Sequence, residues 1–167
     1  MIRRARAADV DFLVDLYGHP EVRPFLAAGA DFSREAVAAD VELSEDEPEV
    51  FGLFVIEANG EPAGAMHFEC VNARSRIARC GALAVDPRFR GRRLADDAAR
   101  EFVHHVIFEL GFHRLEMEIY GFNERSIAHA ERVGWVREGV KRNAYRHGDG
   151  WVDGILYAVV REDLEET

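Results

Sequence analysis

The chain has 167 residues, 48% of them hydrophobic, which suffices for the core of one globular domain and is too short to be read as two. Its formal net charge of −10 argues against general nucleic-acid binding, because that affinity comes mostly from Lys and Arg neutralising phosphates. Its two cysteines, Cys70 and Cys80, form neither a CxxC pair nor a zinc-type cluster, so no disulfide framework and no metal site is indicated.

The N-terminal residues predict a strand followed by a helix. Residues 2–6 are expected to be extended, and Asp9 is expected to cap a helix that runs to Tyr17. Acidic residues at positions 9, 11 and 15 stand where a signal peptide would need an unbroken apolar stretch. No apolar run approaches the roughly 20 residues that cross a bilayer. We therefore expect a cytoplasmic protein that does not enter a membrane.

A second helix and a hairpin follow. Ser33 is expected to begin a helix that reaches Leu43, and the acidic residues 45–49 to form a solvated loop. Residues 51–58 and 63–71 are expected to pair through Asn59-Gly60, because Asn-Gly readily adopts the positive φ angles of a type I′ turn. After a polar turn, residues 76–85 are expected to return as a third antiparallel strand.

The second half predicts a strand-helix-strand unit and a shorter helix. Apolar residues recur at helical spacing from Leu94 to Leu110, and Gly111 stands at the expected C-cap. Residues 115–119 alternate as in a half-buried strand, which makes a parallel crossover with the strand before the helix the expected connection. Helix 123–133, an extended segment from Trp135 and a final strand 151–160 complete the chain.

The segment from Val85 to Ala95 joins an extended apolar stretch to a helix through a basic turn. A helix start exposes unpaired backbone N–H groups and the positive end of the helix dipole, which suits a phosphate. Four arginines, at positions 88, 90, 92 and 93, strengthen this interpretation because guanidinium groups pair with phosphate oxygens. The alternative interpretation is a solvated helix start.

Two motifs and the order of the elements resemble the GNAT superfamily of acetyl-CoA-dependent N-acetyltransferases. The first is the sequence PRFRGRRLA at 87–95, similar to the acyl-CoA loop of that family, and the second is NERSIAHAERVGW at 123–135. The resemblance implies an α/β fold with a mixed, mostly antiparallel central sheet flanked by helices, forming a single N-acetyltransferase domain over residues 1–167. Further segments resemble the branch that holds ribosomal-protein N-terminal and spermidine acetyltransferases.

The resemblance implies acetyl-CoA as co-substrate, no metal, and direct attack by a primary amine in a ternary complex. The residues expected to contact the cofactor are Leu83, Ala84, Val85, Arg88, Arg90, Gly91, Arg92, Arg93, Leu94, Ala95 and Asn123. Arg93 stands where the family usually has Gly or Ala, so its side chain must either turn away from the ligand or grip it. The pantetheine arm is expected to pair with the backbone of residues 83–85 as an added strand does.

The acid and the base of the reaction are less directly indicated. Ala130 occupies the position where many relatives carry a tyrosine, and Ser126 matches a hydroxyl of the ribosomal-protein branch, so Ser126 is predicted to protonate the leaving thiolate. A first-turn serine that satisfies local backbone is the alternative. Cys80 stands where the branch often has an acidic residue, and Glu69 is predicted to act as the base through a water, with His67 interpreted as a solvated group.

The acceptor predicted by the resemblance is a protein N-terminus or a small polycation such as a polyamine or aminoglycoside. An acidic surface attracts any of these, so the charge does not choose among them. Phe25, Phe32, Tyr145 and Trp151 are expected either to border the acceptor or to be core. A homodimer is expected, and the alternative function is a non-catalytic CoA-binding or interaction module with a degenerate site.

Overall fold

The computed structural model describes residues 1–91 and 93–165, which divide into two compact units. The first unit holds Met1–Cys70 and Cys80–Phe102, and the second holds Val71–Arg79 and the chain from Val103 onward. The prediction of a single domain over the whole chain stays a prediction. None of the helices described here combines the length and the apolar character that a membrane crossing requires.

Seven strands form one mixed sheet with the hydrogen-bonded order β1-β2-β3-β4-β5-β7-β6. The strands are β1 (Ile2–Arg4), β2 (Phe51–Ala58), β3 (Glu61–Asn72), β4 (Ile77–Val85), β5 (Arg114–Tyr120), β6 (Val136–His147) and β7 (Gly150–Val160). Strands β4 and β5 run parallel, whereas the pairs β1–β2, β2–β3, β5–β7 and β6–β7 are antiparallel. The predicted mixed, mostly antiparallel sheet with one parallel crossover is therefore confirmed.

Five α-helices accompany the sheet in the described residues. They are α1 (Val10–Gly18), α2 (Arg34–Asp46), α3 (Leu94–His104), α4 (Glu124–Arg132) and α5 (Arg161–Glu165). Single turns η1 (Ala7–Asp9), η2 (Arg23–Phe25) and η3 (Pro87–Phe89) lie in the connections, and η4 (His105–Glu109) continues α3 as a π-helical turn. Helix α2 runs three residues past the predicted end at Leu43, so two residues of the expected acidic loop are helical.

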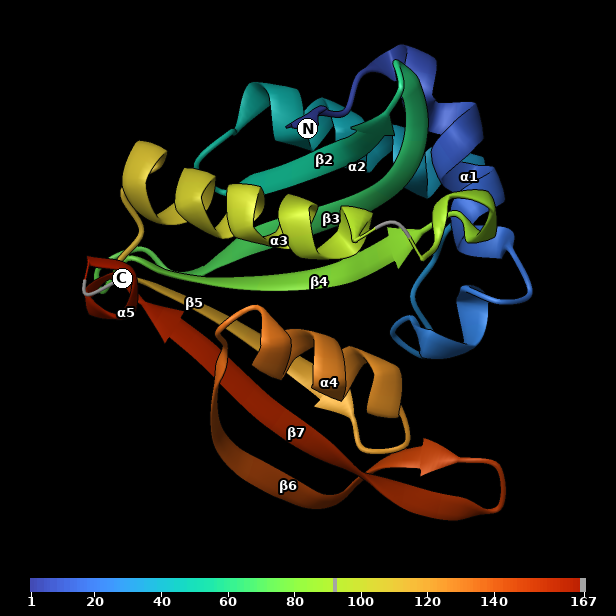
Figure 1. Ribbon diagram of the computed structural model, residues 1–167. Helices are drawn as coiled ribbons and strands as arrows, with labels where there is room; N and C mark the ends of the chain where they lie inside the picture. The colour runs from blue at the N-terminus through green and yellow to red at the C-terminus, as the bar shows by residue number, and fades with distance from the viewer. Residues whose placement is uncertain (92, 166–167) are drawn as a thin grey trace. The chain divides into compact units, whose positions relative to one another are not determined.

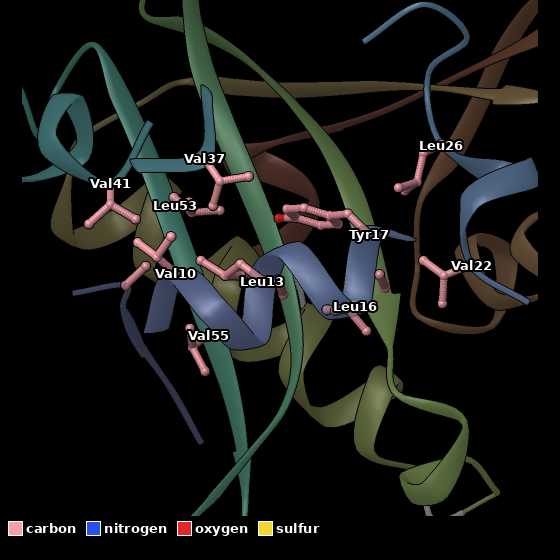
Figure 2. Packing of buried hydrophobic residues seen from close by; sticks show 13 residues of the cluster. Val10, Leu13, Leu16, Tyr17, Val22, Leu26, Val37, Val41, Leu53 and Val55 are labelled. Carbon is pink, nitrogen blue, oxygen red and sulfur yellow. The ribbon is translucent and has the colours of Figure 1, made fainter. Parts of the chain in front are cut away.

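In the first unit, α1 and α2 lie on one face of β2 and β3, and α3 lies on the other face (Figure 1). Figure 2 shows how Leu13, Tyr17 and Val37 of the two helices pack toward Leu53 and Val55 of β2. On the α3 face, the ring of Phe102 meets those of Phe54 and Phe68, with centroids 5.5 and 6.3 Å apart. Both faces of these strands are thus buried, which explains the nearly continuous apolar sequence of β2.

Asp9 precedes α1 as predicted, but its carboxylate does not cap that helix. Its oxygens accept hydrogen bonds from the Arg3 guanidinium, at 2.7 and 2.9 Å, and from the backbone N–H of Arg6, at 2.8 Å. These bonds hold the pKa of Asp9 below its usual range, with the Arg3 hydrogen bond as the main cause. The prediction of a side-chain cap is wrong because Arg3 of the neighbouring strand competes for the same oxygens.

In the second unit, α4 covers one face of β5 and β7 (Figure 1). The hydroxyl of the buried Tyr157 on β7 donates to Glu131 of α4 at 3.0 Å. Tyr157 pairs with Met117 across the β5–β7 ladder, so these two residues face α4. Their neighbours Glu118 and Leu156, also paired, face the opposite side because successive side chains alternate along a strand.

Candidate functional site

The basic segment after β4 is held by a short turn with a buried anchor. The Asp86 carboxylate accepts a hydrogen bond from the backbone N–H of Arg88 at 2.9 Å and so caps η3. Phe89 at the end of the turn is buried, and the backbone N–H of Asp86 bonds the carbonyl of Ala63 on β3 at 2.9 Å. The predicted strand-turn-helix therefore exists, and it is fixed to the sheet at its beginning.

Two of its arginines are bound to carboxylates of the protein itself. The Arg88 guanidinium pairs with Asp86, with Nη2 2.7 Å from Oδ2. The Arg90 guanidinium reaches Glu21, where Nη1 lies 2.7 Å from Oε2 and Nη2 lies 3.2 Å from the carbonyl oxygen. The sequence has four arginines on this segment, but the charges of Arg88 and Arg90 are partly neutralised by their carboxylate partners. Arg92 lies outside the described residues.

The backbone at the start of α3 has the form that suits an anion. Gly91 and Arg93 have φ angles of +79° and +57°, both in the left-handed region. The carbonyl of Arg93 accepts the backbone N–H groups of Asp96 and Asp97 at 3.0 and 3.1 Å, which begins the helix. A helix start presents unpaired backbone N–H groups, and left-handed residues beside it are typical of loops that bind anions. The first-turn acids Asp96 and Asp97 oppose this by adding negative charge.

Strand β4 presents the predicted cofactor residues just before the loop. Leu83 is exposed, Ala84 is buried, and Val85 is half-buried. Ala82, immediately before them, has a φ of +51°, which marks an irregularity in the strand. A Cβ on Gly64 would lie 2.5 Å from the carbonyl oxygen of Ala84, so glycine there permits the close approach of β3 to β4.

The predicted base and its neighbours lie on β3 and β4 in the first unit. Glu69 is exposed, and His67 is half-buried on the same face of β3, against Gly81 of β4 and the ring of Phe51. Burial lowers the pKa of His67 to about 4, so its imidazole is neutral at pH 7; the interpretation as a solvated group is wrong. Burial raises the pKa of the Cys80 thiol to about 12, so Cys80 packs rather than titrates.

The second predicted motif begins α4 in the second unit. The buried Asn123 is the N-cap, and its Oδ1 accepts the backbone N–H of Ser126 at 3.2 Å. Ser126 is half-buried in the first turn, and Ala130 is fully buried. The structure thus brings Asn123 and Ser126 together, and in the first unit it brings Arg90 together with Glu21.

A carboxylate that the sequence did not single out lies on β5. The Oε2 of Glu118 accepts a hydrogen bond from the ammonium of Lys141 on β6 at 2.6 Å, and its Oε1 is sealed from solvent. The alternating pattern of β5 placed Glu118 on the polar side of the strand, but its neighbours Gly154 of β7 and Lys141 of β6 come from strands that follow later in the chain. Within residues 1–91 and 93–165, no three His, Cys, Asp or Glu side chains gather as metal ligands do.

Comparisons with known proteins agree on one family. Residues 1–136 match the family model described as an acetyltransferase (GNAT) domain. The chain is 26% identical over 125 residues to the SPbeta prophage-derived uncharacterized N-acetyltransferase YokL of Bacillus subtilis (strain 168). The aligned region covers 74% of this chain and 68% of that protein.

Solved structures share the fold at lower sequence identity. Spermidine N-acetyltransferase from Vibrio cholerae, in complex with CoA and spermine, superposes with a TM-score of 0.85 at 14% identity, over 98% of this chain and 96% of that one. Ribosomal-protein-S5-alanine acetyltransferase from Vibrio fischeri superposes with a TM-score of 0.81 at 17% identity, over 97% and 93%. Similarity at this level establishes the fold.

Proposed function

The chain belongs to the GNAT acetyltransferase family and is an acetyl-CoA-dependent N-acetyltransferase, and on that premise we propose that its acceptor is a primary amine, either a protein N-terminus or a small polycation. The family, the enzyme class and the GNAT-like fold predicted from sequence are thereby confirmed. The observation that carries the amine proposal is the net charge of −10, which attracts ammonium groups and repels anionic acceptors.

The proposed CoA site is the left-handed backbone at Gly91 and Arg93 with the start of α3. We assign the diphosphate to the backbone N–H groups there, and the pantetheine arm to the strand backbone at Leu83, Ala84 and Val85. We also assign contacts with CoA to six further residues: Arg88, Arg90, Arg92, Leu94, Ala95 and Asn123. Because Arg88 and Arg90 already pair with Asp86 and Glu21, their contribution to phosphate binding requires exchange of those partners.

The proposed reaction is direct transfer in a ternary complex. The neutral amine attacks the thioester carbonyl, a C–N bond forms, the C–S bond breaks, and the amine loses a proton while the CoA thiolate gains one. We assign proton donation to Ser126 and proton acceptance, through a water, to Glu69. Holding the reactants in this arrangement contributes about 7 to 11 kcal/mol in favourable cases.

Thiol release from acetyl-CoA tests the proposal directly. The assay is run with spermidine, an aminoglycoside and short peptides with free N-termini, and with peptides whose N-termini are blocked as controls. Turnover with at least one free amine and none with its blocked form is the expected result. Tight CoA binding with slow hydrolysis that no amine stimulates would instead support the non-catalytic module.

Two substitutions test the assigned residues once an acceptor is known. Ser126→Ala is expected to lower kcat, and an unchanged kcat would reject its role as the acid. Glu69→Gln is expected to lower kcat as well, and full activity would exclude Glu69 as an essential base. His67, neutral at pH 7, is an alternative proton acceptor on the same strand face.

We also propose a cytoplasmic homodimer. Free thiols at Cys70 and Cys80 support a reducing compartment. Sedimentation of the purified protein at two concentrations tests the dimer, and a monomer at both would reject it.

A further inference from the structure

The Glu118 carboxylate on β5 is largely buried and only partly satisfied. Its side chain is 19% exposed, and its Oε1 has no partner in hydrogen-bonding geometry among the described residues. Its other oxygen binds the ammonium of Lys141, whose side chain is 51% exposed. A charged oxygen buried without a full set of hydrogen bonds costs stability, so an arrangement of this kind calls for a functional reason.

Gly154 makes room for this carboxylate. A Cβ at position 154 would lie 2.0 Å from Oε1 of Glu118 and 2.9 Å from Cε2 of Tyr145, so any other residue would displace the acid or the ring. Gly154 stands opposite Lys141 in the β6–β7 ladder and opposite Tyr120 in the β5–β7 ladder. The carboxylate, the lysine and the two tyrosines are therefore fixed around one glycine on three adjacent strands.

Aromatic rings extend from the carboxylate along the same strands. The ring centroids of Tyr145 and Tyr120 lie 5.0 Å apart, those of Tyr120 and Phe122 lie 5.5 Å apart, and those of Phe122 and His147 lie 4.1 Å apart. Burial first, then hydrogen bonding to the Glu118 side chain, and then the charge of that carboxylate raise the pKa of Tyr145 to about 12, so its phenol stays neutral. Neutral aromatic faces beside a carboxylate attract ammonium groups.

This arrangement faces away from α4, the helix that carries Asn123 and Ser126. Glu118 pairs with Leu156, on the strand face opposite to the one that Tyr157 and α4 share. Within the second unit, the last residue pair between β4 and β5 is Arg79 and Glu116, two residues before Glu118. Strand β5 thus presents its acid on the face that α4 leaves uncovered.

We propose that Glu118, with Tyr120 and Tyr145, is the site that binds the ammonium group of the acceptor, and that Lys141 occupies it when no acceptor is bound. This inference rests on the proposed function, because it concerns the amine that receives the acetyl group. A primary ammonium is the same kind of donor as the ammonium of Lys141, so an acceptor that displaces the lysine can take over its hydrogen bond to Oε2 of Glu118. Lys141 can leave because half of its side chain is in solvent.

Steady-state kinetics with two amines test the site: spermidine, and a hexapeptide with a free N-terminal alanine. The amine whose KM responds to the variants identifies the source of the ammonium. Glu118→Gln is expected to raise the KM for that amine at least tenfold and to change the KM for acetyl-CoA less than twofold. Lys141→Met is expected to lower the KM for the same amine severalfold, because the internal competitor is gone.

Gly154→Ala and Gly139→Ala form a matched pair on neighbouring strands. A Cβ at Gly139 meets only Leu156, at 3.8 Å, so this control is expected to keep the wild-type KM values. Gly154→Ala is expected to raise the KM for the amine as Glu118→Gln does. Thermal unfolding of each variant shows which remain folded.

The outcomes separate the two proposals. If the folded Glu118→Gln and Lys141→Met variants both keep the wild-type KM for each amine that the enzyme acetylates, the pair is a structural ion pair and the inference is overturned. If the wild-type protein acetylates no amine, the proposed function fails. In that case calorimetric titration of spermidine and of the hexapeptide into the wild type and Glu118→Gln still decides the site, since equal affinities of the two proteins for both amines would overturn it.

Discussion

Arg93 carries a side chain at a backbone position that favours glycine. Its φ of +57° costs a residue with a Cβ about 1 kcal/mol relative to an unstrained conformation. We predict that Arg93→Gly keeps or improves the affinity for CoA, because the exposed guanidinium is not needed and the loop loses strain. Calorimetric titration with CoA measures this. A large loss of affinity would show that the Arg93 side chain is itself a ligand.

The matched control is Gly91→Ala in the same loop. A Cβ at Gly91 meets no neighbouring atom within 4 Å, so the substitution adds only the strain of its φ of +79°. Its effect on CoA affinity is expected to be opposite in sign to that of Arg93→Gly. The two variants together separate the conformation of the loop from the charge of its side chains.

His67 makes stability depend on pH in a definite direction. Burial lowers its pKa to about 4, whereas the unfolded chain binds the proton near the usual value of about 6.5. As the pH falls from about 6.5 toward about 4, His67 binds a proton in the unfolded state but not in the folded state. The free energy of unfolding that is present above about pH 6.5 is therefore lost toward about pH 4. At pH 5 the expected loss is about 2 kcal/mol relative to pH 7.

Urea unfolding at pH 7 and pH 5 measures this loss in the wild type and in His67→Gln. The variant has no group that titrates at this position, so its stability is expected to fall by about 2 kcal/mol less over the same interval. An equal fall in both proteins would assign the pH dependence to other groups.

At the scale of elements, Ser44 joins helix α2 to strand β2. Its hydroxyl is fully buried and accepts hydrogen bonds from the backbone N–H of Leu53 at 2.9 Å and from Arg4 at 3.0 Å. Ser44→Ala is predicted to destabilise the protein by about 1 to 3 kcal/mol, because the Leu53 N–H is left buried without this acceptor. Denaturant unfolding measures the change, with the exposed Ser75→Ala as a control expected within about 0.5 kcal/mol.

Elements with strong local signals were predictable from the sequence. Asn59 and Gly60 have φ angles of +53° and +82°, as the type I′ turn requires, and Gly134 follows α4 with a φ of +95°. Strand β6 was predicted only at its beginning, because 10 of its 12 residues are exposed and no apolar alternation marks it. Helix α3 changes to a π-helical turn after His104, for which we find no cause in the local sequence.

At the scale of the whole molecule, the contacts that the sequence could not reveal join residues far apart along the chain. Arg90 and Glu21 are separated by 69 positions, and Lys141 and Glu118 by 23. Motif spacing located the loop and the Asn123 helix, because those signals are local. It could not show that carboxylates elsewhere neutralise the arginines, since pairing depends on which strands and turns become neighbours.

The net charge of −10 leads to the last prediction, which concerns salt. If the acceptor is a polyamine, long-range attraction by the acidic protein raises its local concentration, and this attraction weakens as salt shortens the Debye length from about 30 Å at 0.01 M to about 8 Å at 0.15 M. The KM for spermidine is therefore predicted to rise over this range, and more steeply than the KM for a monoamine. Initial rates at several salt concentrations measure both slopes. A spermidine KM that does not change with salt would show that contacts within the site, and not the charge of the whole protein, decide which amine is bound.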